Sequence, residues 1–127
     1  MAIRIELNLR LPNSPGALAG VCRVLSDERV NILALSLEAG GALRLVVDNH
    51  VHAAGVLRDR RHDVQMRDVL YAVLPNDPGS LMGVARLLAE ASVNLEYAYG
   101  SGLEGGAMAA LVIGVEDAQR ASAAAGI

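Results

Sequence analysis

The sequence contains no tryptophan and no phenylalanine, and only three tyrosines in 127 residues. So few rings leave little surface on which nucleic-acid bases could stack. The formal net charge of −3 also offers no positive footprint to a phosphate backbone. We therefore expect no nucleic-acid partner.

Cysteine and long apolar segments are scarce as well. Cys22 is the only cysteine, so no internal disulfide can form, and the N-terminus lacks the pattern of a secretion signal. The longest apolar run, residues 106–115, covers about ten residues, far fewer than the ~20 that span a bilayer. With 53% hydrophobic residues the chain is too apolar to be disordered. We expect a soluble, cytoplasmic protein with no membrane partner.

The sequence does contain an internal repeat. Residues 11–36 align without gaps with residues 74–99, at an offset of 63, and twelve of these 26 positions are identical. Beyond a turn that is two residues longer in the second copy, residues 41–43 are aligned with residues 106–108. We therefore predict two small units, each of which buries little surface alone.

The first unit begins with a strand and a helix. Apolar and polar residues alternate from residue 3 to residue 10, which predicts a strand with one face in water. Ser14 as N-cap and Pro15 at the first helical position predict a helix over about 15–28. Cys22 belongs to the apolar stripe of this helix, and its counterpart in the second copy is Ala85, so it is interpreted as a small core residue.

The rest of the unit completes a known order of elements. Residues 30–37 and 42–47 are predicted strands joined through Gly40-Gly41, followed by a helix at 49–60 and a strand at 64–67. The order βαββαβ is the ferredoxin-like arrangement, an α+β fold with antiparallel strands and helices on one face. We predict two such units in tandem, residues 1–68 and residues 69–127.

The second unit differs from the first at its end and in its strands. After a predicted helix at 116–124 almost no chain remains, so its last strand is missing or is supplied from elsewhere. Residues 69–74 and 107–113 are apolar on both faces, and such strands must be covered on both. We therefore expect a homo-oligomer, most simply a homodimer.

Residues 100–105 match the G-x-G-x-x-G fingerprint of dinucleotide-binding proteins. The fingerprint needs a helix after the glycines, whereas residues 107–113 are predicted to form a strand. We interpret the segment as a glycine-rich hairpin loop and expect no cofactor.

No pattern of residues indicates a metal site or a catalytic group. His50 and His52 are two residues apart on a predicted helix and point to different sides, and no cysteine or carboxylate completes a ligand set. His50, His52 and His62 are interpreted as solvated side chains. We find no serine with a base that any known motif would place beside it.

The most informative feature is the turn that both copies share, Leu-Pro-Asn-x-Pro-Gly-x-Leu, at residues 11–18 and 74–81. Proline and glycine explain a tight entry into the helix. The free N–H groups of a first helical turn also attract a carboxylate, and the asparagine supplies an amide beside them. Asn31 and Asn94, at the head of the next strand, can add further amides. These groups suit a zwitterion.

At these residues the sequence resembles the ACT domain family, small ferredoxin-like modules that bind amino acids and regulate amino-acid metabolism. Both copies match, through residues 13–18 with 30–32 and residues 76–81 with 93–95. The resemblance spans essentially the whole chain and is closest to free-standing proteins with two ACT units. It implies that ligands bind where paired modules meet. There the loop after the first strand and the asparagine at the start of the second strand would hold the ligand.

The resemblance also implies which residues contact the ligand. Serine-sensing members have a histidine two residues before the first asparagine; leucine stands at both positions here, which argues against serine. We favour the first unit as the carboxylate site, because Asp77 in the second unit would repel a carboxylate where Ser14 is neutral. The candidate ligand-binding residues are Leu11, Asn13, Ser14, Gly16, Ala17, Leu18, Asn31, Ile32, Leu74, Asn76, Asp77, Gly79, Ser80, Leu81, Asn94 and Leu95.

Two classes of function follow, neither of them catalytic. The first is an amino-acid-binding sensor or regulatory protein. The second is a regulatory subunit of an amino-acid biosynthetic enzyme, similar to the small subunit of acetohydroxyacid synthase. A small ferredoxin-like enzyme is a weaker alternative, because fold alone does not set function.

Overall fold

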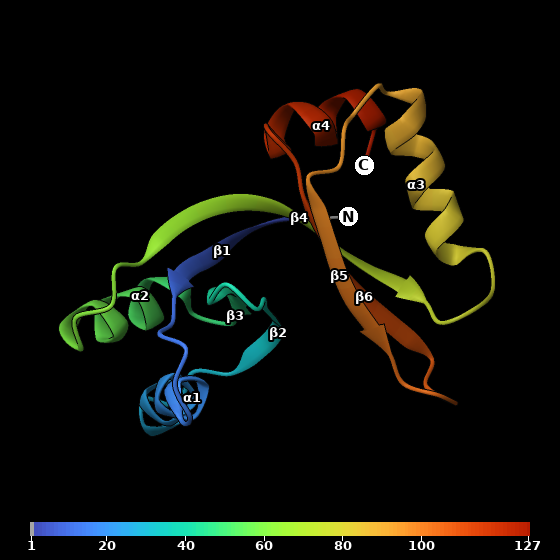
Figure 1. The fold of residues 1–127 in the computed structure, drawn as a ribbon. Helices are drawn as coiled ribbons and strands as arrows, with labels where there is room; N and C mark the ends of the chain where they lie inside the picture. Colours follow the sequence, from blue (N-terminus) through green and yellow to red (C-terminus); the bar gives the residue numbers. More distant parts are fainter. Residues whose placement is uncertain (1) are drawn as a thin grey trace. The chain divides into compact units, whose positions relative to one another are not determined.

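A computed structural model describes residues 2–127 of the chain (Figure 1). Six strands and four helices follow one another in this part of the chain. Their bounds are β1 (Ala2–Arg10), α1 (Ala17–Asp27), β2 (Ile32–Leu37), β3 (Ala42–Val47), α2 (His50–Asp59), β4 (Gln65–Pro75), α3 (Ser80–Glu90), β5 (Tyr97–Gly102), β6 (Met108–Gly114) and α4 (Ala118–Ala125).

The chain divides into two compact units. One comprises Ile5–Arg67, and the other joins residues 2–4 to Asp68–Ile127. We call them the first and the second unit. The division passes through two strands, because β1 begins in the second unit and β4 begins in the first.

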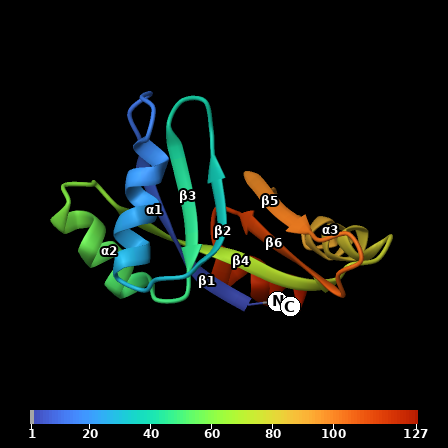
Figure 2. The same cartoon turned by 90° about the horizontal axis from the view of Figure 1, so that it is seen from below.

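The first unit is a small antiparallel sheet with two helices on one face. β3 pairs with both β1 and β2, with Arg10 opposite Ala42 and Leu37 opposite Leu43. Helices α1 and α2 pack against each other (Figure 2). Buried leucines and valines of β1 and β3 meet the buried stripe of α1 and the alanines of α2 in one core, and burial of this apolar surface drives the unit to fold.

The second unit repeats the pattern. β6 pairs antiparallel with β4 and β5, and α3 contributes Val84 and Leu88 to the core. Ile3, from the start of β1, packs against the same cluster. Residues 2–4 therefore stand with this unit, which has no strand of its own after α4. The prediction of an α+β fold with two ferredoxin-like units is confirmed.

The region between the two repeat copies is one strand rather than two. The sequence predicts strands at 64–67 and 69–74, but β4 runs without a break over Gln65–Pro75. Residues 65–74 contain neither glycine nor proline, and Asp68 alone does not make a turn, so the extended backbone continues through it.

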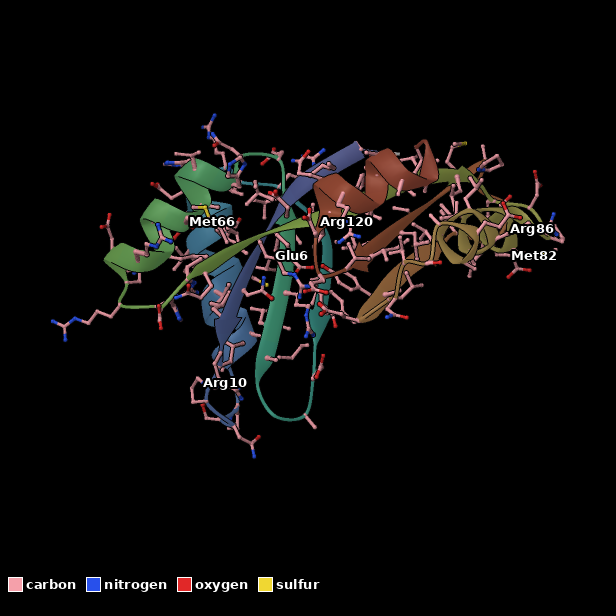
Figure 3. All side chains as sticks on the ribbon, turned by 90° about the horizontal axis from the view of Figure 1, so that it is seen from above. Glu6, Arg10, Met66, Met82, Arg86 and Arg120 are labelled. Carbon is pink, nitrogen blue, oxygen red and sulfur yellow. The ribbon has the colours of Figure 1, made fainter. Side chains whose placement is uncertain are left out.

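The prediction of a water-facing side for the first strand is wrong at Glu6. This side chain is completely buried, and Asn8 Nδ2 donates a hydrogen bond to its Oε1 at 3.1 Å (Figure 3). Alternation of residue types identifies two faces of a strand but not what covers them. A carboxylate tolerates burial when hydrogen bonds replace its water.

The predicted alignment of the two hairpins is also wrong. β3 pairs Ala42 with Arg10, whereas β6 pairs Ala110 with Val73, the repeat counterpart of Arg10. Ala42 therefore corresponds to Ala110, three residues further along than predicted. Residues 105–110, which lead into β6, are mostly glycine and alanine. Several pairings of β6 with β4 are therefore equally compatible with the sequence pattern. The second unit has the longer β-hairpin, with its tip at residues 103–107.

Candidate functional site

Each unit carries a loop that leads from its first strand into its first helix. The predicted cap Ser14 and its repeat counterpart Asp77 are not the N-caps: Gly16 and Gly79 are, with left-handed φ angles of 84° and 89° and no side-chain cap. This conformation favours glycine, because a Cβ is strained there. The sequence signal for Ser14 was misleading because the Pro15-Gly16 turn delays the helix by two residues.

The uncapped helix start leaves backbone donors unused. In the first unit Ala17 N–H bonds to Ser14 O at 3.3 Å and Gly20 N–H to Gly16 O at 2.9 Å. The N–H groups of Leu18 and Ala19 make no hydrogen bond within residues 2–127. Such donors sit at the positive end of the helix dipole.

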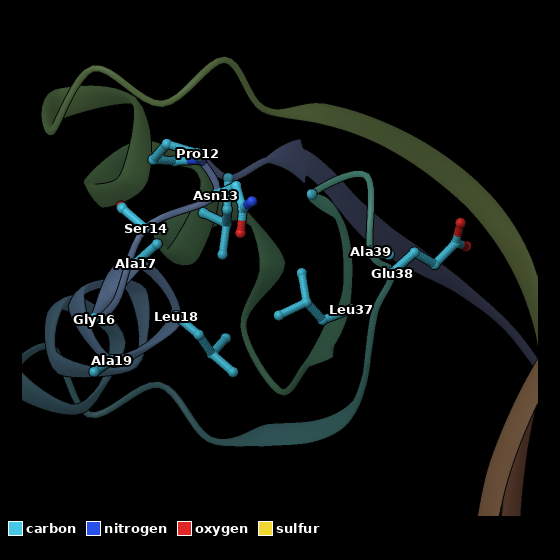
Figure 4. A pocket seen from close by; sticks show the side chains of 12 residues that line it. Pro12, Asn13, Ser14, Gly16, Ala17, Leu18, Ala19, Leu37, Glu38 and Ala39 are labelled. Atoms are coloured by element: carbon cyan, nitrogen blue, oxygen red, sulfur yellow. The ribbon is translucent and has the colours of Figure 1, made fainter.

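A cavity of about 460 Å³ opens beside this helix start, between the loop and the β2–β3 hairpin (Figure 4). The side chains of Asn13, Leu18 and Leu37 border it, while Glu38 points away and forms an ion pair with Arg44. Six predicted residues line it together: Leu11, Asn13, Ser14, Gly16, Ala17 and Leu18.

The hairpin side of this cavity was missed by the sequence analysis. Leu37, Ala39 and Gly41 belong to its wall. Leu11 N–H donates to Gly41 O at 2.8 Å, and a Cβ on Gly41 would overlap Leu11 O. Because Gly41 also has a φ of 90°, only glycine fits where the hairpin meets the loop. The Gly40-Gly41 pair was the available signal, but it was interpreted as a turn alone.

Asn13 is free to interact. Its exposed side chain makes no hydrogen bond with any other residue of the described chain. A carboxamide offers two donor hydrogens and an acceptor oxygen. Asn13 therefore presents both kinds of group at the edge of the cavity.

The second unit has a cavity of about 560 Å³ at the corresponding place. The predicted residues that line it are Leu74, Asn76, Asp77, Ser80, Leu81 and Leu95. Gly79 lies at the start of α3 but does not border this cavity. Residues of β5 and β6 that sequence reasoning missed, including Ala98, Gly100 and Leu111, form the opposite wall.

Asn31 and Asn94, the asparagines at the head of the second strand in each repeat copy, do not line the cavity beside the helix start of their own unit. Asn31 and Ile32 line a separate cavity of about 410 Å³ beyond the C-terminal end of α1, with Cys22 and Arg29. Asn31 N–H donates to Asp48 Oδ1 at 3.0 Å. Asn94 lies in a cavity of about 290 Å³ beside Asp117 and Arg120. An eleven-residue helix separates the two ends of each unit by roughly 16 Å.

Neither a metal centre nor a membrane span is found among residues 2–127. No group of three or more histidine, cysteine or acidic side chains is close enough to hold a metal ion. His52 instead lies 3.5 Å from Glu28, measured from Nε2 to Oε1. None of the described helices has both the length and the apolar character to cross a bilayer.

Comparison with known proteins identifies the family. A family model described as an ACT domain pair matches residues 1–125. The chain belongs to the ACT domain family. A search of curated proteins finds no match.

Several solved structures are similar to this ACT pair. A crystal structure of a protein from Bacteroides thetaiotaomicron is similar with a TM-score of 0.86 and 29% identity, over 96% of this chain and 85% of that one. The ligand-free regulatory subunit of aspartate kinase from Thermus thermophilus is similar with a TM-score of 0.70 and 17% identity, over 98% of this chain and 92% of that one.

Aspartokinase III of E. coli, in complex with lysine and aspartate, gives a TM-score of 0.59 and 17% identity, over 94% of this chain. The ACT pair spans only 30% of that enzyme. At these identities the aspartate kinase likenesses establish the fold alone.

Proposed function

We propose that this ACT pair is a non-catalytic regulatory protein that binds a free amino acid. The binding site is the cavity beside the start of α1, which we call the first cavity. One observation carries the proposal: unused backbone donors and an unbonded carboxamide meet at one cavity of about 460 Å³. Small-molecule sites are commonly concave, mostly apolar, and equipped with a few converging polar groups. The first cavity has this composition.

The ligand carboxylate has a partner at the start of α1. The N–H groups of Leu18 and Ala19 have no acceptor in the chain, and the helix dipole favours a negative charge there. The neighbouring cap-region residue, Ser14, carries no charge that would oppose the carboxylate.

The remaining groups of an amino acid find complementary surfaces nearby. Asn13 can donate to the carboxylate or accept from the ammonium group. Leu18 and Leu37 provide an apolar surface for the side chain (Figure 4). The ligand is thus held at its polar end by the loop and at its side chain by the helix and hairpin.

A thermal-shift screen of the twenty amino acids with the full chain tests this proposal. A ligand that binds only the folded state raises the midpoint of unfolding, and the shift grows with ligand concentration. We expect one amino acid, or a few related ones, to raise it. The proposal fails if no amino acid shifts the midpoint at millimolar concentration.

A second candidate function is that of a regulatory subunit of an amino-acid biosynthetic enzyme. The observation that favours it is the likeness to a separate regulatory subunit of aspartate kinase, most of whose length is matched. Pull-down of the tagged chain from its native extract tests this function. Stoichiometric recovery of a larger enzyme supports it, and recovery of the chain alone opposes it.

A further inference from the structure

Asn13 is the only asparagine of this chain that precedes a small, uncharged residue, Ser14. The other asparagines precede leucine, isoleucine, histidine or aspartate. Asparagine is chemically labile, because the backbone nitrogen of the following residue can attack its side-chain carbonyl carbon, Cγ. A bulky or acidic following residue hinders this attack, whereas serine leaves room for it.

Both groups that would react are loosely held at Asn13 (Figure 4). The carboxamide is exposed and makes no hydrogen bond with any other residue of the described chain. Ser14 is exposed too, and its N–H donates to Pro12 O at 2.9 Å in a three-residue turn, outside any helix or strand. The nitrogen and Cγ can therefore approach each other without disturbing regular structure.

The start of α1 favours the negative charge that such a reaction develops. The N–H groups of Leu18 and Ala19 have no acceptor among residues 2–127, and both residues line the first cavity together with Asn13. The attacking nitrogen is deprotonated, and the oxygen on Cγ becomes negative when the nitrogen adds. The positive end of a helix dipole lowers the free energy of both charges.

The repeat counterpart Asn76 is protected against the same attack. Its Nδ2 donates to Leu103 O at 2.8 Å and to Gly106 O at 3.1 Å, so the carboxamide is bound to the hairpin tip, residues 103–107. The residue that follows is Asp77, whose carboxylate disfavours a second negative charge on its own backbone nitrogen. The two copies of one motif therefore differ in reactivity.

The remaining asparagines each lack one of the two conditions. The side chains of Asn8 and Asn49 take part in hydrogen bonds within their own units. Asn31 and Asn94 precede bulky apolar residues. Only Asn13 combines an unbonded carboxamide with a small following residue.

We propose that Asn13 is a site of spontaneous deamidation, and that the product abolishes amino-acid binding in the first cavity. The Ser14 nitrogen, after its proton has passed to solvent, forms a bond to Asn13 Cγ. The bond between Cγ and Nδ2 breaks, and Nδ2 takes a proton from solvent and leaves as ammonia. Water then opens the cyclic imide to aspartate or isoaspartate. The net change consumes water and releases ammonia, with no oxidant or reductant.

The product alters the charge at the edge of the first cavity. A neutral carboxamide with two donor hydrogens becomes a carboxylate that only accepts hydrogen bonds. This carboxylate competes with a ligand carboxylate for the N–H groups of Leu18 and Ala19, and it repels the ligand carboxylate. This second part rests on the proposed function, because it assumes that the first cavity binds an amino acid.

Mass-spectrometric peptide mapping of the aged full chain tests the modification site without any ligand. After incubation in mildly alkaline buffer, the peptide that contains Asn13 should gain about 1 Da, as the loss of ammonia and the uptake of water require. We expect Asn13 to react about tenfold faster than Asn76 or more, because two hydrogen bonds must first break at Asn76. Equal rates at the two residues, or an unreacted Asn13, would overturn the modification site.

Substitutions of Ser14 should change the rate in opposite directions. Ser14→Gly removes the side chain beside the attacking nitrogen and should accelerate the reaction, whereas Ser14→Val adds bulk there and should slow it. Ser14 caps no helix, so both variants should fold, which circular dichroism checks. Equal rates in the two folded variants would contradict attack by the Ser14 nitrogen.

Gly102→Ala tests the protection of Asn76. A Cβ on Gly102 would lie 2.6 Å from Asn76 Oδ1, so the methyl group displaces the carboxamide from the hairpin tip. We expect faster deamidation at Asn76 and an unchanged rate at Asn13. An unchanged rate at Asn76 would show that the tip does not protect it and would contradict the proposed difference between the two copies.

Isothermal titration with the amino acid found in the screen tests the loss of binding. The fraction of the chain that binds should fall in step with the fraction deamidated at residue 13. The control is the same chain kept for the same time in mildly acidic buffer, where the Ser14 nitrogen keeps its proton. Full binding by the deamidated chain would overturn this part of the proposal.

The outcomes separate this inference from the proposed function. If no amino acid binds the fresh chain, the proposed function and the loss of binding are both wrong, while peptide mapping still decides whether Asn13 is the modification site. If the fresh chain binds and Asn13 stays intact on ageing, the proposed function stands and the modification site is wrong.

Discussion

Gly41 and Gly20 lie in the same unit but in opposite surroundings. A Cβ on Gly41 would overlap the carbonyl oxygen of Leu11, at a left-handed φ, whereas Gly20 in α1 faces open space. We predict that Gly41→Ala lowers the free energy of unfolding by about 2 kcal/mol or more. Gly20→Ala should raise it by up to about 1 kcal/mol, because alanine is the better helix former.

Urea denaturation of the two variants checks this pair of predictions. The midpoint should fall for Gly41→Ala and rise for Gly20→Ala, with similar slopes. A stable Gly41→Ala protein would mean that the hairpin does not rest on the loop as described, and the wall of the first cavity would then be in error.

Asn13 and Asn76 show why single residues were only partly predictable from the sequence. They occupy the same place in the same motif, and both were predicted as ligand contacts. Their difference comes from a hairpin tip about thirty residues further along the chain. Motif comparison cannot detect it, because the contact depends on the length of the second hairpin.

At the scale of elements, the sequence analysis did not identify two helix N-caps, one an asparagine and the other an aspartate. Asn49 Oδ1 accepts from His52 N–H at 3.2 Å at the start of α2, and Asp117 Oδ1 accepts from Arg120 N–H at 3.0 Å at the start of α4. We predict that Asn49→Ala and Asp117→Ala each lower the free energy of unfolding by about 1 kcal/mol.

Ser14→Ala and Asp77→Ala are the matched variants for these caps. Neither side chain caps a helix, so each change should stay within about 0.5 kcal/mol. Chemical denaturation of the four variants compares them directly. A large loss for Ser14→Ala would restore the cap that the sequence predicted.

Helices and paired strands followed well from the sequence, and hairpin register did not. The stripe of α1, from Leu18 to Leu25, and the exact span of β3 are set by local periodicity, which the sequence displays. The register of β6 is set by pairing with β4, and its small apolar residues give no unique pattern. Burial of Glu6 likewise depends on tertiary packing.

At the scale of the whole molecule, the second unit exposes much large apolar surface. The exposed residues there include Val73, Leu81, Met82, Leu87, Leu95 and Met108. Met82 and Arg86 extend outward from α3 (Figure 3), where Arg86 Nη2 lies 3.5 Å from Met82 Sδ. We predict a homodimer that covers part of this surface.

Light scattering with matched variants checks the oligomeric state. Leu87→Glu on α3 should shift the chain toward monomer, because a carboxylate replaces an apolar contact. Val51→Glu, at an exposed position of α2 in the first unit, should leave the mass unchanged. A monomeric unsubstituted chain at high micromolar concentration would contradict the prediction.

The central claim is that the first cavity binds an amino acid through the loop before α1. Isothermal titration of the full chain, with the amino acid found in the screen, compares the unsubstituted protein with Asn13→Ala. We predict a loss of ~1–3 kcal/mol, or roughly 5- to 150-fold in affinity, because a desolvated polar group of the ligand loses its partner. Unchanged affinity in a folded Asn13→Ala protein would contradict the account.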